Sequence, residues 1–228
     1  MLQQRAYLQS RIENMKDRGQ RIDWLAQLNV QPRIVADFGC HIGDETFGLI
    51  WVVDATEAVG IDMKSSAIQQ ARNSLRSIRE DIELAERMLT YHTDMVAPDD
   101  LEWWRSQVPD FLKRHDFPEF MEGDVTRPTD LPDDHFGLAY CRYVLYHICG
   151  ELDELGTKDV QAAIREMARV VKPGGWVVAI EPTQPSLTDN RLLDFKPFFQ
   201  NAGLECVAAV YDAVLIPQPE ETYIYRKT

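Results

Sequence analysis

The chain has 228 residues, 45% of them hydrophobic and 27% charged, which suits one α/β domain with a real core. Its formal net charge of −13 at pH 7 makes nucleic acid an unfavourable substrate, because a phosphate backbone would be repelled unless a basic patch were set apart. The longest apolar run, residues 47–53, is too short to cross a bilayer, and the N-terminus lacks a signal-peptide pattern. We therefore expect a cytoplasmic protein without a membrane span.

Two features that could mark other kinds of site are weak in this sequence. The four cysteines are widely scattered, without a CxxC or Cys/His cluster, so neither a disulfide framework nor a metal site is predicted. The most basic stretch, residues 5–21, also carries acidic residues and is interpreted as a solvated helix face rather than a nucleic-acid patch.

The first 53 residues predict a helical segment followed by a strand and a helix. Apolar residues recur at helical spacing before residue 30, with an interruption at Gly19. The apolar run 34–38 ends in a glycine-bearing turn, which is typical of a buried parallel strand. A helix over residues 44–53 follows.

A second strand, residues 58–61, ends at Asp62 and leads into a long helical pattern. Apolar residues then alternate at steps of three and four, which forms an a/d seam. A continuous helix over this seam would be about 39 Å long, against about 17–20 Å for a typical central strand. The helix must therefore either break in two or project past the sheet. The seam consists of Ile68, Ala71, Leu75, Ile78, Ile82, Ala85 and Leu89.

The rest of the chain continues the alternation of strands and helices. A loop over residues 92–98 precedes a helix that Asp99 or Asp100 can cap and that Pro109 kinks or ends. Strands alternating with helices predict a doubly wound, Rossmann-like sheet, whose ligands lie outside the carboxyl ends of the strands. The later predicted segments are strands at 120–122, 136–141 and 176–180, helices at 160–171 and 192–201, a turn at 172–175, and closing strands at 206–210 and 222–225 around a Pro-bearing loop at 216–219.

Three motifs fall at predicted strand ends. The glycines of the turn 37–43 (Asp-Phe-Gly-Cys-His-Ile-Gly) let the backbone approach a ligand closely. Asp62, nineteen residues after Gly43, can accept hydrogen bonds from ribose hydroxyls. The segment 123–125 (Gly-Asp-Val) can recognise an adenine edge through a carboxylate and a backbone N–H, or can be a simple Asx turn. The GxGxxG spacing of a Rossmann dehydrogenase is not met.

Together these motifs resemble the class I S-adenosylmethionine-dependent methyltransferase family over about residues 33–226. That family has Asp/Glu-x-Gly-x-Gly-x-Gly, an acidic residue ending strand two, an Asp after strand three and a Pro-Gly-Gly turn before strand five. The resemblance implies one methyltransferase domain over 1–228, with a seven-stranded sheet that is mostly parallel with an antiparallel last strand. A helical N-terminal cap over 1–30 and a helical insertion over 73–117 would complete it.

The resemblance also implies S-adenosylmethionine as cofactor, with S-adenosylhomocysteine as product. Where the family has its middle glycine this chain has His41, which needs a backbone conformation that histidine can reach. Residues expected around the methionine part are Asp37, Gly39, Cys40, His41 and Gly43, with Cys141 and Arg142 on its amino or carboxylate group. Those expected around the nucleoside are Asp62 on the ribose, Met63 against the adenine, and Asp124 with Val125 at its edge.

Methyl transfer from a sulfonium is an in-line displacement, so the protein positions the acceptor and removes its proton where needed. His147 is the candidate general base, with Tyr143 and Tyr146 as pocket walls; the alternative is a structural hydrogen-bonding role for His147. Arg142 binds a substrate carboxylate or pairs with a nearby acid. The predicted reaction is methylation of a small molecule at N, O or C.

Alternatives stay open for the reaction and for the insertion. The chain could methylate protein or RNA, or could be a non-catalytic partner protein that binds the cofactor. The connection from Asp62 to Phe120 exceeds a usual crossover and holds the seam and Trp103-Trp104. It could form a lid over the acceptor pocket, form a homodimer through the 66–91 helix, or only pack on its own sheet.

Overall fold

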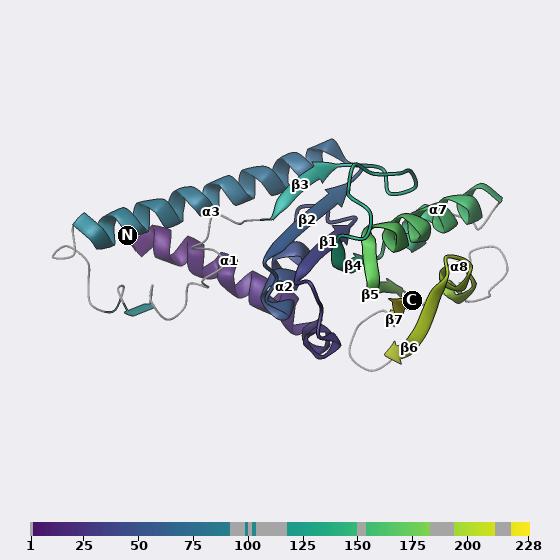
Figure 1. The fold of residues 1–228 in the computed structure, drawn as a ribbon. Helices are drawn as coiled ribbons and strands as arrows, with labels where there is room; N and C mark the ends of the chain where they lie inside the picture. The colour runs from purple at the N-terminus through teal and green to yellow at the C-terminus, as the bar shows by residue number, and fades with distance from the viewer. Residues whose placement is uncertain are drawn as a thin grey trace.

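A seven-stranded sheet forms the centre of the computed structural model, with helices on both faces (Figure 1). The strand order is β3-β2-β1-β4-β5-β7-β6, and β7 runs antiparallel to both of its neighbours, while β1–β5 pair in parallel. The predicted sheet is therefore confirmed. The structure describes residues 2–91, 99, 102–103, 118–149, 154–182, 194–212 and 220–228.

The bounds of the strands and helices follow the chain order. The strands are β1 (Ile34–Phe38), β2 (Glu57–Asp62), β3 (Glu119–Glu122), β4 (Phe136–Arg142), β5 (Val171–Pro182), β6 (Leu204–Asp212) and β7 (Glu220–Lys227). The helices are α1 (Leu2–Gln20), the 3-10 helix η1 (Asp23–Leu28), α2 (Asp44–Val53), α3 (Ser65–Tyr91), α6 (Leu145–Cys149), α7 (Glu154–Val170) and α8 (Lys196–Asn201).

Each face of the sheet buries its own apolar core. Along β4, Leu138 and Tyr140 pack in the core beneath α1, α2 and α3, whereas Ala139 and Cys141 pack in the core beneath α7 and α8. This alternation follows from the two-residue period of a strand that is covered on both faces. Polar groups are thereby confined to the strand ends, which is where a ligand site can form.

Helix α3 is unbroken over its 27 residues and projects past the sheet, with α1 beside it (Figure 1). The seam residues from Ile68 to Ile82 are buried in one core with Leu8, Ile12 and Met15 of α1. The projecting alternative is therefore the correct one. At these seam positions the chain's own helix covers the apolar face, so the seam gives no reason to expect a dimer.

Helices α1 and α2 are in close contact where they cross, at Gly19 and Gly48. A Cβ at Gly48 would lie 3.0 Å from the Gly19 nitrogen and 3.1 Å from the Arg18 Cβ, so only glycine lets the helices approach this closely. Helix α1 ends at Gln20 and η1 begins at Asp23, so the interruption predicted at Gly19 is confirmed to within one residue. Gly19 also allows the close packing against α2.

Other boundaries differ locally from the prediction. Helix α7 ends at Val170, and the residues predicted as a turn before the fifth strand, 172–175, form a bulge inside β5, where Gly174 has φ +77°. The short helix α6 was not predicted as a helix. Helix α8 begins at Lys196 rather than at 192.

Parts of the predicted insertion lie outside the described residues. These parts are the loop 92–98 and most of the helix predicted after it. The loop predicted at 216–219, near the C-terminus, also lies outside the described residues. Within the insertion, Trp103 is partly buried against the core that α1 and α3 share. Among the described helices, none has the length and apolar character needed to span a membrane.

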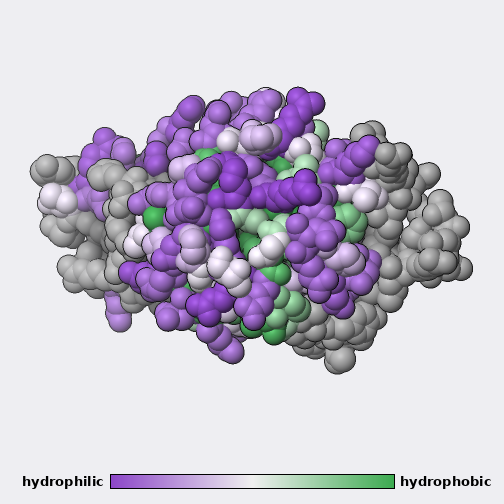
Figure 2. All heavy atoms as spheres, turned by 45° about the vertical axis from the view of Figure 1, so that its right-hand side comes forward, coloured by the Kyte–Doolittle hydropathy of each residue, from purple (hydrophilic) through white to green (hydrophobic). Residues whose placement is uncertain are grey.

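The surface of the described residues is mainly polar. Figure 2 shows hydrophilic side chains over most of one face, with apolar ones gathered near its middle. Of the large hydrophobic side chains that the structure describes, Met63 and Val207 stand out as exposed, at 69% and 52%.

We expect Gly48→Val to lower the free energy of unfolding by about 1–3 kcal/mol, because the added side chain would push α1 away from α2. Urea unfolding measures this change. Arg165→Val, at an exposed position of α7, is the control for the lower helix propensity of valine. If both variants unfold at the same urea concentration, the helix crossing is not tight.

Candidate functional site

The turn between β1 and α2 is hydrogen-bonded to β2 and has left-handed backbone at two glycines. The N–H groups of Gly39 and Cys40 donate to the Ile61 carbonyl at 2.7 and 2.9 Å, which ties the turn to the end of β2. Gly39 and Gly43 have φ of +76° and +83°, and a Cβ would meet Val144 at 2.3 Å or Phe120 at 2.4 Å. Both glycines are therefore required by backbone angle and by space.

His41 adopts the left-handed backbone that its position demands. Its φ is +50°, a value that histidine reaches more readily than a branched residue does. This confirms the predicted backbone requirement. The side chain is exposed, while the backbone N–H donates to Asp62 Oδ2 at 2.9 Å.

Asp62 joins the ends of two neighbouring strands. Its Oδ2 accepts from the His41 N–H, and its Oδ1 accepts from the Lys64 N–H at 2.8 Å. The residue is only 8% exposed. Because each carboxylate oxygen has two lone pairs, Asp62 can hold the turn and still accept a hydrogen bond from a ligand hydroxyl.

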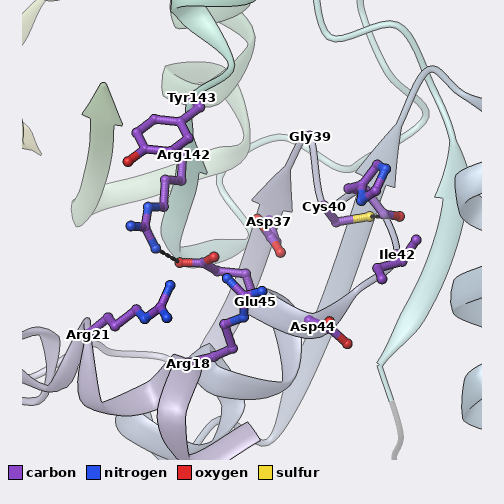
Figure 3. A pocket seen from close by; sticks show the side chains of 11 residues that line it. Arg18, Arg21, Asp37, Gly39, Cys40, Ile42, Asp44, Glu45, Arg142 and Tyr143 are labelled. Atoms are coloured by element: carbon purple, nitrogen blue, oxygen red, sulfur yellow. Dashed lines mark hydrogen bonds and ion pairs between the residues drawn. The ribbon is translucent and has the colours of Figure 1, made fainter. Parts of the chain in front are cut away.

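A cavity of about 490 Å³ opens beside this turn (Figure 3). Its walls come from the C-terminal end of α1, the β1–α2 turn, the first turn of α2 and the end of β4. The residues lining it are Arg18, Arg21, Asp37, Gly39, Cys40, His41, Ile42, Asp44, Glu45, Arg142 and Tyr143.

An ion-pair network closes one wall of the cavity. Arg142 donates to Glu45 Oε1 at 3.0 Å and to Glu220 Oε1 at 2.6 Å. Tyr140 donates to Glu45 at 2.9 Å, and the Tyr143 hydroxyl donates to Glu220. Burial disfavours the charge on Arg142, but Glu45 and Glu220 outweigh it and raise the pKa of the guanidinium. Of the roles predicted for Arg142, the structure shows the pairing with nearby acids.

Tyr143 is the second cavity residue with an unusual backbone. Its φ is +59°, and its N–H donates to the Ile180 carbonyl at 2.8 Å. The ring lies 5.0 Å from the Arg142 guanidinium carbon, a cation–π distance. Left-handed backbone at a bulky residue costs about 1–3 kcal/mol and persists where surrounding contacts fix it, commonly at functional sites.

Asp37 is a buried carboxyl at the base of the cavity. Burial raises its pKa to about 7, which the hydrogen bond from Thr46 Oγ1 at 2.6 Å opposes and the charges of Glu45 and Asp62 reinforce. Near neutral pH the group is therefore shared between its acid and its carboxylate form. A cation placed in the cavity would favour the carboxylate.

The sequence did not single out Glu181, which organises the end of β4. It lies at the end of β5, 1% exposed, and accepts from the N–H groups of Val144, Leu145 and Tyr146 at 3.2, 3.0 and 3.0 Å. Burial raises its pKa to about 8, against the effect of these donors. The signal in the sequence that could have identified Glu181 is a carboxylate directly after the apolar run 176–180. Glu181 positions α6, which begins two residues after Tyr143.

The cavity brings together part of the predicted set. Lining it are the predicted residues Asp37, Gly39, Cys40, His41, Arg142 and Tyr143, whereas Arg18, Arg21, Ile42, Asp44 and Glu45 were not predicted. Gly43, Asp62 and Met63 surround the same turn. Ile42, Asp44 and Glu45 lie in or directly after the predicted turn, whereas Arg18 and Arg21 reach the cavity through helix packing, which the sequence pattern does not encode.

The remaining predicted residues lie elsewhere. Cys141 is fully buried in the core on the α7 side. Tyr146 and His147 lie on α6 with ring centroids 5.5 Å apart, and the His147 side chain is exposed; neither is among the residues that line the cavity. Asp124 accepts from Thr126 N and Oγ1 at 3.0 and 2.7 Å, so the Asx-turn alternative is realised there, beside the buried Val125.

No cluster of three or more potential metal ligands occurs within the part of the chain that the structure describes. The acids of the cavity instead pair with arginines or hydroxyls. Their arrangement suits an organic ligand that carries hydroxyl and charged groups.

Residues 81–179 match the model of a family described as a methyltransferase domain. A search of curated proteins found no match. Among many similar solved structures is a SAM-dependent methyltransferase from Methanosarcina mazei, 16% identical, with a TM-score of 0.56 over 85% of this chain and 92% of that chain.

Two further structures illustrate the range of these likenesses. One is an S-adenosylmethionine-dependent methyltransferase from Clostridium acetobutylicum, 12% identical, with a TM-score of 0.59 over 94% of this chain and 91% of that chain. The other is the [4+2]-cyclase SpnF, 17% identical, with a TM-score of 0.58 over 92% and 80%. Identities this low show the fold, and a fold does not by itself fix the reaction.

The pKa of Asp37 predicts a pH-dependent stability. Between its ordinary value of 3.8 and about 7, the folded protein holds a proton that the unfolded chain releases, so stability falls as the pH rises through this window. At about 1.4 kcal/mol per pKa unit, Asp37 accounts for a few kcal/mol of this fall in the free energy of unfolding. We expect Asp37→Asn to remove that part of the pH dependence.

Urea unfolding at a series of pH values between 4 and 8 measures this effect. The slope should become shallower in Asp37→Asn without vanishing, because Glu181 makes a contribution of the same sign. Asp130→Asn, at an exposed position, should keep the wild-type slope. An unchanged slope in Asp37→Asn would contradict the raised pKa.

Proposed function

We propose that this chain is a class I S-adenosylmethionine-dependent methyltransferase and that it methylates a small-molecule acceptor at N, O or C; the domain match and the fold support this. S-adenosylmethionine is the cofactor that the family implies. The observation that carries the proposal is the turn between Gly39 and Gly43, held by Asp62 beside the cavity. A cavity of about 490 Å³ lies within the range of small-molecule sites.

The described residues fit the methionine end of this cofactor. Space at the two glycines lets ligand atoms approach the backbone of the turn, and Asp37 gains its negative charge most readily when a cation is near. Arg142, held by Glu45 and Glu220, contributes to the same wall. The residues proposed here are Asp37, Gly39, Cys40, His41, Gly43 and Arg142. Cys141 is left with an indirect role, because its side chain is buried.

The residues beside the turn fit the nucleoside end. Asp62 has acceptor capacity beyond the two backbone N–H groups that it binds, which suits the ribose hydroxyls. The exposed Met63 offers an apolar surface for the adenine ring. Asp124 and Val125 follow the carboxyl end of β3, beside the carboxyl end of β2, and suit recognition of the adenine edge.

The cofactor supplies an already activated methyl group, so the protein's part is to orient the acceptor and exclude water. We propose His147 as the general base and Tyr143 and Tyr146 as walls for the acceptor. Supporting this, α6 carries Tyr146 and His147 directly after Tyr143, and Glu181 fixes the start of that helix. The Trp103 segment, packed on the shared core of α1 and α3, would complete a lid.

Two properties of the chain favour a small acceptor in the cytoplasm. The net charge of −13 opposes RNA, which is the substrate of one alternative. All four cysteines are free thiols, as is usual in a reducing compartment. Methylation of a protein and a non-catalytic cofactor-binding role are the remaining alternatives; cofactor binding without turnover of any acceptor would identify the second.

We expect the protein to bind S-adenosylhomocysteine and Asp62→Ala to weaken that binding by about tenfold or more, the value of one charge-assisted hydrogen bond. Isothermal titration calorimetry measures the affinity, and mass spectrometry of the native protein would reveal a co-purified S-adenosyl compound. Asp130→Ala, at an exposed site, is the matched control. Undetectable binding by the wild type would refute the proposed function.

We expect His147→Ala to reduce turnover by about 10²–10⁴-fold, the usual contribution of a general base, with unchanged affinity for S-adenosylhomocysteine. A screen of metabolites with labelled donor would first identify the acceptor. The control is His135→Ala, since His135 lies near Glu57 at the amino ends of the strands, opposite the proposed site. If turnover barely changes, His147 is not the base; if no metabolite is methylated although the cofactor binds, the non-catalytic alternative holds.

A further inference from the structure

Two arginines of α1 reach the cavity from outside the sheet. Arg18 and Arg21 lie at the C-terminal end of α1 and just after it, and both line the cavity. The Gly19–Gly48 crossing brings this end of α1 against α2. Figure 3 shows both side chains on the α1 side of the cavity and away from Gly39, with Arg18 beside Glu45 and Arg21 below Arg142 in this view.

The carboxylates near these arginines are already bound by other groups. Glu45 accepts from Arg142 and Tyr140, and Asp44 has Asn14 at 3.4 Å and Arg11 at 4.0 Å. Asp37 accepts from Thr46 and is partly protonated near neutral pH. Within the described part of the chain, no carboxylate comes within ion-pair distance of Arg18 or Arg21.

Such a pair of arginines is unexpected in this chain. With 37 acidic against 24 basic residues, a surface arginine has many carboxylates available. The proposed cofactor adds a positive sulfonium, so a loaded cavity would contain more positive charge still. Guanidinium groups bind carboxylates and phosphates through paired N–H donors, and two of them on one wall suit an anion.

We propose that Arg18 and Arg21 form an anion subsite that binds a carboxylate or phosphate group of the methyl acceptor. This rests on the proposed function and narrows its substrate to an acidic small molecule. The cofactor's own carboxylate offers the same chemistry. The acceptor is favoured because the residues proposed for the methionine part lie on β1, in the turn after it and on β4, whereas both arginines come from the C-terminal end of α1 and the residue after it.

The first arm of the test separates the acceptor from the cofactor. Isothermal titration calorimetry compares S-adenosylhomocysteine binding by the wild type and by Arg18→Gln/Arg21→Gln. We expect affinities that agree within about twofold, since the cofactor's carboxylate would be bound elsewhere. A loss of about tenfold, the size of one charge-assisted hydrogen bond, would assign the arginines to the cofactor and overturn the proposal.

The second arm measures anion binding directly. Inorganic phosphate is titrated into the S-adenosylhomocysteine-loaded protein and followed by phosphorus NMR. We expect saturable binding by the wild type that weakens by about tenfold or more in the double variant. Arg165→Gln, which removes an exposed arginine of α7, should match the wild type. Absent binding, or equal binding by the double variant, would overturn the subsite.

Failure of the proposed function gives a different result. In that case the wild type does not bind S-adenosylhomocysteine, whatever phosphate does. Circular dichroism and urea unfolding of the double variant test whether it is folded; if it is, a lost phosphate signal reflects the missing guanidinium groups.

Discussion

The carboxylate of Asp62 fixes the geometry on which the rest of the site depends. By accepting the N–H groups of His41 and Lys64, it ties the turn after β1 to the end of β2. The turn fits between Phe120 of β3 and Val144 after β4 because Gly39 and Gly43 have no side chain to meet them. Asp62 thus fixes the position of the turn backbone, which a ligand could approach, relative to the carboxylate that could accept the ligand's hydroxyl groups.

Charge pairing around Arg142 has a comparable role on the opposite wall. Its two carboxylate partners come from the start of α2 and the start of β7, so one guanidinium joins three elements at the ends of their strands or helices. Removing one partner of a buried pair leaves an uncompensated charge, which costs more than the pair contributes. The network therefore favours a single arrangement of the cavity wall and leaves the α1 arginines available for a ligand.

Two further carboxyls show how burial prepares this end of the sheet. Asp37 and Glu181 end β1 and β5 on either side of β4, and burial raises the pKa of both toward neutrality. Asp37 faces the cavity, whereas Glu181 faces the backbone of α6. A buried carboxyl group would therefore gain its charge beside a cationic ligand at Asp37, whereas at Glu181 it orders a helix.

Local chemistry made much of this protein predictable from its sequence. The runs 34–38 and 44–53 gave a strand and a helix with the observed bounds, since apolar runs and glycine turns act over a few residues. The left-handed backbone of His41 followed from its place in the turn. Tertiary structure decided what depends on contacts between distant segments. Gly19 packs against Gly48 of α2, and Arg18 and Arg21 reach the cavity because the end of α1 lies against α2 there. Glu45 pairs with Arg142 of β4, a partner nearly a hundred residues away in the chain. Periodicity records which face of a helix is buried, but not which distant charge each side chain will meet.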